Sequence, residues 1–159
     1  MQGRRIIHLV AAAVMLAAMA TPASAGDAEV TSGQFITLSG GTGLGYQITG
    51  HAEMRRAPGQ GGKTIVTVHL SGLDADTVYP THVHNAACNA SPAGGSHYQH
   101  QVGGPVDSVN EIWPVVNTNA AGNGFGRATH SNWARPDAMA IVVHYPANTA
   151  IRLACVDLR

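Results

Sequence analysis

The sequence predicts an all-β protein, a Greek-key barrel or sandwich of about eight short antiparallel strands with one long irregular loop. Three observations predict this class. Short runs of alternating or β-branched residues recur along the chain, Gly-rich turns separate them, and no long amphipathic helical period appears. Residues 85–110 lack an apolar period, and a loop of that length in a compact domain usually carries function.

The N-terminal 25 residues predict a signal peptide. Arg4 and Arg5 give a positive start, residues 6–20 are apolar, and Ala23-Ser24-Ala25 forms a small-residue cleavage site. The apolar stretch is too short for a transmembrane helix. We therefore expect cleavage near Ala25 and a periplasmic or secreted protein. The paired arginines leave both general and twin-arginine export open.

Residues 26–159 predict one domain. Without Arg4 and Arg5 the chain has seven basic and nine acidic residues, so its net charge is about −2. Such a surface attracts neither nucleic acid nor an anionic membrane, and we expect no membrane contact in the mature form. No dedicated subunit interface is visible, so monomer and dimer both stay open.

The strands follow from the alternation, taken in chain order. Residues 26–45 are Gly/Ser/Thr-rich and predict only one short strand, near 35–38. Turns are expected at 57–62, 71–76 and 117–123, where Gly, Pro, Asn and Asp gather. The remaining strands are expected at 46–54, 63–70, 78–84, 111–116, 125–130, 138–145 and 151–157.

Four histidines predict a metal site. His82 and His84 are two residues apart in an expected strand, so both side chains point to the same face. His97 lies in the long loop, and His144 ends the apolar run 140–143. A cage of imidazole nitrogens suits copper best among the common divalent metals. The long loop is then a metal-binding loop.

The other histidines and the tryptophans have simpler interpretations. We expect His51, His69 and His130 to lie at the surface or in ordinary hydrogen bonds. His100 stands near the proposed site and stays a candidate for a weak second metal contact. Trp113 and Trp133 are expected to be packing residues.

Cys88 and Cys155 predict one disulfide, because an even pair in an exported chain is oxidised in its compartment. The alternative, two free thiols, stays open at this point.

Several motifs together resemble the copper/zinc superoxide dismutase family, over roughly residues 45–156. They are Thr81-His82-Val83-His84 followed by Cys88, then Gly94-Gly95-Ser96-His97-Tyr98, Gly103-Gly104-Pro105-Val106-Asp107, Ile141-Val142-Val143-His144 and Arg152-Leu153-Ala154-Cys155. Each motif is weak alone, but their order matches the family's order. The resemblance implies that His82, His84, His97 and His144 bind copper and that Arg152 attracts superoxide.

The departures resemble the copper-only branch of that family. Val102, Glu111 and Pro114 stand where the resemblance would place two zinc histidines and an aspartate, so the usual zinc site is not expected. Only seven residues separate His144 from Arg152, where the family carries a long charged loop.

The resemblance also implies roles in turnover. It implies that His97 leaves copper on reduction, takes up a proton, and returns on reoxidation. With no zinc to hold the far nitrogen of His97, we expect a protein group to do so, and Glu111 is the first choice because a carboxylate orients an imidazole and raises its basicity.

The sequence therefore predicts an exported superoxide dismutase that converts superoxide to O₂ and H₂O₂ by cycling copper between Cu²⁺ and Cu⁺. One alternative is a non-catalytic copper-binding protein, a buffer or donor, on the same fold. Arg152 disfavours this alternative, because a storage site needs no cation for an anionic substrate. A second alternative, a metal-free structural module, leaves the four histidines unexplained.

Overall fold

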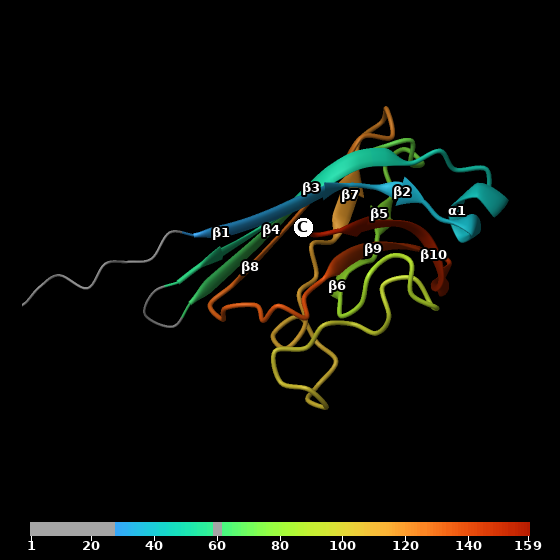
Figure 1. Ribbon diagram of the computed structural model, residues 1–159. Helices are drawn as coiled ribbons and strands as arrows, with labels where there is room; N and C mark the ends of the chain where they lie inside the picture. The colour runs from blue at the N-terminus through green and yellow to red at the C-terminus, as the bar shows by residue number, and fades with distance from the viewer. Residues whose placement is uncertain (1–27, 59–61) are drawn as a thin grey trace, which may run out of the picture.

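Two antiparallel sheets form a sandwich, and the 28–58 and 62–159 segments that the computed structural model describes contain ten strands and one short helix (Figure 1). The predicted signal peptide, 1–25, lies outside the described residues, as does part of the predicted 57–62 turn. Within the described part, no helix has the length and hydropathy to span a membrane. The elements are β1 Glu29–Gln34, β2 Ile36–Thr37, α1 Ser39–Gly43, β3 Thr49–Ala57, β4 Lys63–Ser71, β5 Val78–Tyr79, β6 Thr81–His84, β7 Val116–Thr118, β8 Gly124–His130, β9 Ala140–Tyr145 and β10 Asn148–Asp157.

The strand order places elements from both chain ends side by side. One sheet has six strands in the order β1-β3-β4-β8-β7-β5, and the other has four in the order β2-β10-β9-β6. β6 pairs with β9, although the long loop and two further strands separate them in sequence. The predicted all-β class is confirmed, with short strands raising the count above eight.

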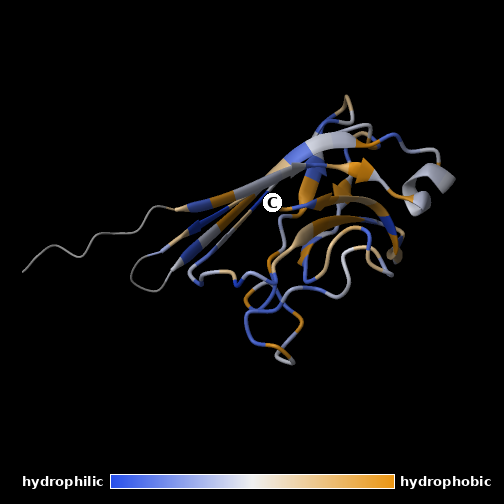
Figure 2. Cartoon of the chain, in the orientation of Figure 1, coloured by the Kyte–Doolittle hydropathy of each residue, from blue (hydrophilic) through white to orange (hydrophobic). Residues whose placement is uncertain are grey.

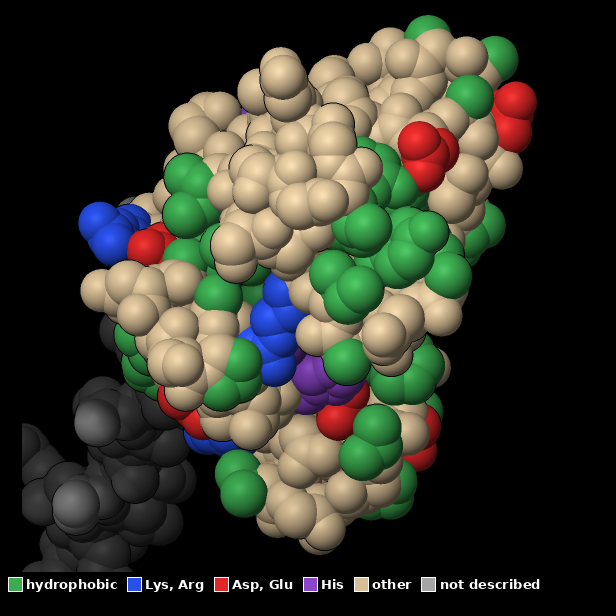
Figure 3. Space-filling view, turned by 90° about the vertical axis from the view of Figure 1, so that its right-hand side faces the viewer, with side chains coloured by type: hydrophobic (Ala, Val, Ile, Leu, Met, Phe, Trp, Pro, Cys, Tyr) green, Lys and Arg blue, Asp and Glu red, His purple; other side chains and the backbone are tan. Residues whose placement is uncertain are grey.

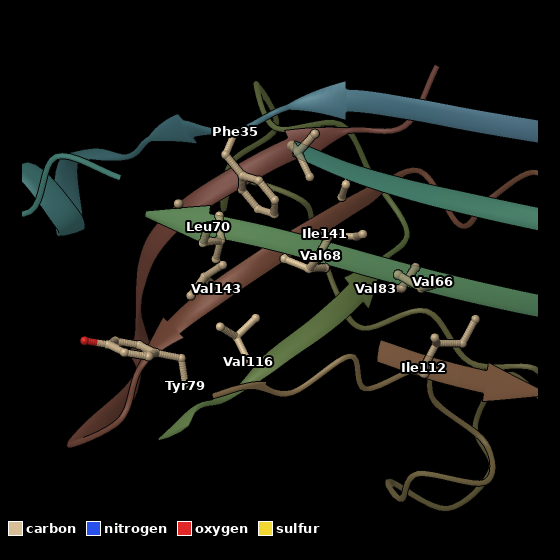
Figure 4. Packing of buried hydrophobic residues seen from close by; sticks show 14 of the residues in the cluster. Phe35, Val66, Val68, Leu70, Tyr79, Val83, Ile112, Val116, Ile141 and Val143 are labelled. Carbon is tan, nitrogen blue, oxygen red and sulfur yellow. The ribbon is translucent and has the colours of Figure 1, made fainter. Parts of the chain in front are cut away.

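The main core fills the space between the sheets. Along β3 and β4 of the six-stranded sheet its residues alternate with exposed ones, as a sheet with one buried face requires. Met54, Val66 and Val68 face inward from the six-stranded sheet, and Val83 and Ile141 from the other. Figure 4 shows the labelled side chains meeting between the two layers, and Figure 2 shows hydrophobic and hydrophilic residues alternating along the long strands of the six-stranded sheet.

Proline divides the expected strand 78–84. The structure has β5 in the six-stranded sheet and β6 in the four-stranded sheet, with Pro80 between them. Proline has no N–H to continue a ladder, so the chain changes sheets there. The prediction of one continuous strand is therefore wrong.

Two other strand predictions need correction. β1 was not expected, because its Thr, Ser, Gly and Gln residues give little apolar alternation, yet it pairs with β3 over six residues as an exposed edge. The expected strand at 111–116 is irregular up to β7, and Glu111 makes only an isolated bridge to Gln99. Pro114 interrupts the ladder there.

The predicted disulfide Cys88–Cys155 is present, and it lies on the outer side of the four-stranded sheet. With Ala140 and Val142 it forms a second, smaller buried cluster beneath the long loop. The bond ties the start of that loop to β10. The backbone N–H of Cys88 also donates to the Asp157 carboxylate at 2.7 Å, which adds a second tie to the same strand.

Removing the disulfide should destabilise the protein mainly through the unfolded chain. The C88S/C155S variant frees a crosslink between residues 67 apart, which is worth about 4 kcal/mol by loop-closure entropy. Urea unfolding of the two proteins measures the difference. A change below about 1 kcal/mol would contradict this account.

Candidate metal centre

Four imidazoles converge on the outer face of the four-stranded sheet. One nitrogen from each of His82, His84, His97 and His144 lies within 4.8 Å of the others. Strand alternation places three of them there: Val83 points into the core, so its neighbours His82 and His84 point outward, and His144 follows the inward-pointing Val143. The fourth, His97, comes from the loop that covers this face. Its backbone forms an isolated antiparallel β-bridge with His84.

Hydrogen bonds fix the tautomers of three rings. Nδ1 of His84 lies 3.3 Å from the Gly95 carbonyl, and Nδ1 of His144 lies 2.6 Å from the Thr149 carbonyl. Nδ1 of His97 lies 2.7 Å from a carboxylate oxygen of Glu111. Carbonyl and carboxylate oxygens only accept, so each Nδ1 carries the proton and donates it. When these rings are neutral, each Nε2 therefore carries a free lone pair.

These lone pairs face one another without a proton between them. Nε2 of His84 and Nε2 of His144 are 3.3 Å apart, and neither can donate to the other. The buried Nδ1 of His82 also has no hydrogen-bond partner among the described residues. Buried acceptors without donors are costly, and a cation shared by all four removes the cost. The donor set therefore fits a metal ion bound by nitrogen.

Burial keeps the strand histidines neutral, as metal ligands must be. Desolvation, with help from the charges of neighbouring histidines, lowers the pKa of His82 to about 3 and that of His84 to about 2. Desolvation also lowers the pKa of His144 to about 4. The nearby Arg152 guanidinium adds to the lowering at His84 and His144.

Glu111 is buried, with 1% of its surface exposed, and three donors satisfy its carboxylate. Oε2 accepts from His97 Nδ1 at 2.7 Å and from the Trp113 indole N–H at 2.9 Å. Oε1 accepts from the Gln99 carboxamide at 3.1 Å. The structure thus places Glu111 against the far nitrogen of His97. Trp113, expected only to pack, and Gln99 are the partners that the sequence analysis missed, and the two-residue spacing of Trp113 from Glu111 was the available signal.

A β-bulge aims Arg152 at the same face. Arg152 pairs with His144 while Ala154 pairs with Val143, so β10 has one extra residue at Leu153. Simple alternation would put Arg152 and Cys155, three residues apart, on opposite faces. The bulge turns Leu153 into the core and Arg152 outward, where its guanidinium donates to the Ala93 carbonyl of the loop.

The site opens to solvent beside positive charge. In Figure 3, histidine side chains surface between a Lys or Arg side chain and an Asp or Glu side chain. His97 keeps 30% of its side chain exposed, whereas His84 is fully buried. The cluster is therefore accessible to solvent from the side of His97.

His100 lies outside the four-histidine cluster of the described residues and pairs with His130. Tyr98 is fully buried. Its hydroxyl oxygen accepts a hydrogen bond from the Arg135 backbone N–H and lies 3.3 Å from Nδ1 of His100. Nε2 of His100 lies 3.3 Å from Nδ1 of His130. Both ring nitrogens of His100 are thus engaged by protein groups. His51 and His69 stack on the exposed face of the six-stranded sheet.

Fold and site together define a β-sandwich protein with a candidate metal centre of four histidines. No protein-family model matches the chain, and no curated protein matches it in sequence. Solved structures do match. Superoxide dismutase 5 of Candida albicans, with a glutamate-to-glutamine mutation, aligns at a TM-score of 0.54 and 20% identity, over 81% of this chain and 89% of its own. Its Cu(II) form aligns at a TM-score of 0.51 and 19% identity, over 81% of this chain and 90% of its own.

The chain therefore has the superoxide dismutase fold, and the resemblance noted in the sequence is confirmed at that level. At 20% identity or less, the likeness carries the fold alone. What the site binds and does rests on the geometry of its own residues.

The lowered pKa values predict acid sensitivity of the metal-free protein. Between about pH 6.5 and pH 4, His82, His84 and His144 take up protons in the unfolded chain but not in the folded one. The free energy of unfolding should therefore fall as the pH drops below 6.5, by about 1 kcal/mol or more at pH 5. Urea unfolding across this range measures it. The decrease in the free energy of unfolding should be smaller in H144Q, which has one fewer histidine to protonate. A free energy of unfolding that stays constant over this pH range would contradict the argument.

Proposed function

We propose that this protein is an exported, copper-dependent superoxide dismutase that converts superoxide to O₂ and H₂O₂. The observation that carries the proposal is the set of unprotonated imidazole nitrogens that face one another, with a guanidinium directed to the same face. The shared fold with a superoxide dismutase supports it. The predicted signal peptide supports export.

His82, His84, His97 and His144 would hold the metal. We propose copper because a cage of imidazoles favours it over the other divalent metals. When bound, copper supplies one-electron chemistry, oxidising one superoxide to O₂ and reducing a second, with two protons, to H₂O₂. The protein groups hold the ligands neutral and oriented: the Gly95 carbonyl does this for His84, and the Thr149 carbonyl for His144.

Arg152 would bind and orient the anionic substrate. Its guanidinium is a permanent cation with several donors, one of which is fixed on the Ala93 carbonyl. The remaining donors can meet a diatomic anion at the mouth of the site. The disulfide between Cys88 and Cys155 ties the strand that carries Arg152 to the start of the loop, and the hydrogen bond to the Ala93 carbonyl restrains the guanidinium itself.

Glu111 would take the part that zinc plays in the zinc-bearing members of the resembled family. It holds the Nδ1 proton of His97 through a charge-assisted hydrogen bond, so Nε2 keeps its lone pair for the metal or for a proton. His97 keeps 30% of its side chain exposed, which suits a residue that exchanges protons with solvent. The usual zinc site is not part of the proposal.

The proposal is tested by copper analysis of the exported protein followed by a superoxide-decay assay. We expect one copper per chain and fast decay. R152A should keep its copper but lose activity by about 10-fold or more, because electrostatic steering and anion binding are removed. R127A, which removes an exposed arginine from the outer face of β8, is the matched control and should remain active.

Each other result points to another function. Copper without superoxide decay would favour the buffer or donor, and a chain that retains no copper would overturn the proposal. Loss of copper from R152A would make the role of Arg152 structural.

Replacing Glu111 should separate orientation from metal binding. E111Q keeps the shape of the side chain but offers His97 Nδ1 a neutral acceptor in place of a carboxylate. We expect activity to fall by about 10-fold and its pH profile to change. E53Q, on the exposed face of β3, is the control. A pH profile identical to that of the wild-type protein would remove Glu111 from the mechanism.

A further inference from the structure

Trp113 contacts two different parts of the candidate metal centre. On one side its indole N–H donates to Oε2 of Glu111 at 2.9 Å. On the other side its ring lies edge-on to His82, with the ring centroids 5.5 Å apart and the planes at 64°. One side chain therefore contacts both a histidine from β6 and the carboxylate that holds the loop histidine.

The indole N–H is needed by the carboxylate. Glu111 is buried, and its Oε2 serves both His97 and Trp113, whereas Oε1 serves Gln99. The indole and the carboxamide approach different oxygens and so fix the plane of the carboxylate. Without the indole, one of three donors is lost, and the carboxylate can turn away from His97. A buried charge with too few donors is costly.

The ring of Trp113 is needed by His82. No hydrogen bond from a described protein group engages the side chain of His82, whose Nδ1 is among the nitrogens left for the metal, whereas one hydrogen bond holds Nδ1 of each of the other three imidazoles. The ring instead packs against aromatic neighbours: His97 and His144, at centroid distances of 4.1 and 5.0 Å, and Trp113 on the side of Glu111. Packing thus orients His82, whereas hydrogen bonds orient the rest.

The backbone beneath Trp113 is rigidly supported. A Cβ added at Gly126 on β8 would lie 2.3 Å from the carbonyl oxygen of Pro114 and 2.9 Å from that of Val115. Glycine at 126 therefore allows the segment after Trp113 to press directly on the sheet. Trp133 offers a contrast, because it is 38% exposed and lies in the loop after β8.

We propose that Trp113 is a positioning residue for the metal centre, which orients His97 through Glu111 and orients His82 by direct packing. The inference rests on the proposed copper site but not on its turnover. It assigns two separable parts to one side chain: the N–H donor acts on Glu111, and the aromatic edge acts on His82.

Three variants separate the parts. W113F keeps an aromatic ring against His82 and removes the donor, W113L removes both, and W133F is the matched control. We expect W133F to match the wild-type protein in Cu²⁺ affinity, measured by chelator competition, and in its Cu²⁺ electron paramagnetic resonance spectrum. W113F should bind Cu²⁺ about 10-fold more weakly with a shifted spectrum, and W113L more weakly still.

A measurement on the metal-free protein keeps the inference testable if a variant does not fold. The chain has only two tryptophans, so its ¹⁵N–¹H spectrum has two indole signals, and W133F assigns them. The indole proton of Trp113 should exchange with solvent more slowly than that of Trp133. E111Q should move the Trp113 signal and leave the Trp133 signal in place.

The outcomes distinguish this inference from the proposed function. Equal Cu²⁺ affinity and equal spectra for W113F, W113L and W133F would overturn the role of Trp113 and leave the proposed function standing. An indole signal of Trp113 that does not move in E111Q would do the same. Copper binding without superoxide decay would overturn the proposed function and leave Trp113 as a positioning residue. A wild-type protein that binds no copper would overturn both.

Discussion

The Nε2 atoms of His84 and His144 stand 3.3 Å apart in a buried place, each with its proton committed to the opposite side of the ring. Two acceptors at that distance repel unless a cation lies between them. The carbonyls of Gly95 and Thr149 enforce this arrangement, because they leave each imidazole only one tautomer. The surrounding fold must therefore supply enough rigidity to keep two unfavourable neighbours together.

That rigidity comes from the four-stranded sheet and from the loop that crosses it. β6 and β9 are hydrogen-bonded neighbours, so His82, His84 and His144 inherit their spacing from the ladder. The loop that brings His97 has no ladder of its own, and it is tied down by the Cys88–Cys155 disulfide and by Arg152 on the Ala93 carbonyl. The strands thus set three nitrogens, and the fourth is set by the disulfide, by hydrogen bonds and by the isolated bridge between His97 and His84.

The sequence was a good guide wherever local rules decide the outcome. The His82–His84 spacing places both rings on one face, and the pairing of the two cysteines follows from compartment and parity. The division of 78–84 at Pro80 was visible in the sequence and was missed, because proline removes a ladder donor whatever its neighbours are. The edge strand β1 was not visible, since it is stabilised by pairing with β3 rather than by an apolar face. The outward turn of Arg152 needs a bulge, and strand alternation alone gives the wrong face.

Glu111 and Trp113 show why the environment of a site is harder to predict than its ligands. A histidine pattern reports nitrogens that must converge, but the groups behind them need only reach a proton or a ring edge. Here a buried carboxylate is satisfied by one imidazole, one indole and one carboxamide, with no permanent cation among the three. Its negative charge is then stabilised by hydrogen bonds rather than by a fixed cation, and one of those bonds sets the orientation of the His97 ring. The same carboxylate would stabilise both a metal bound at the four nitrogens and a proton held at His97.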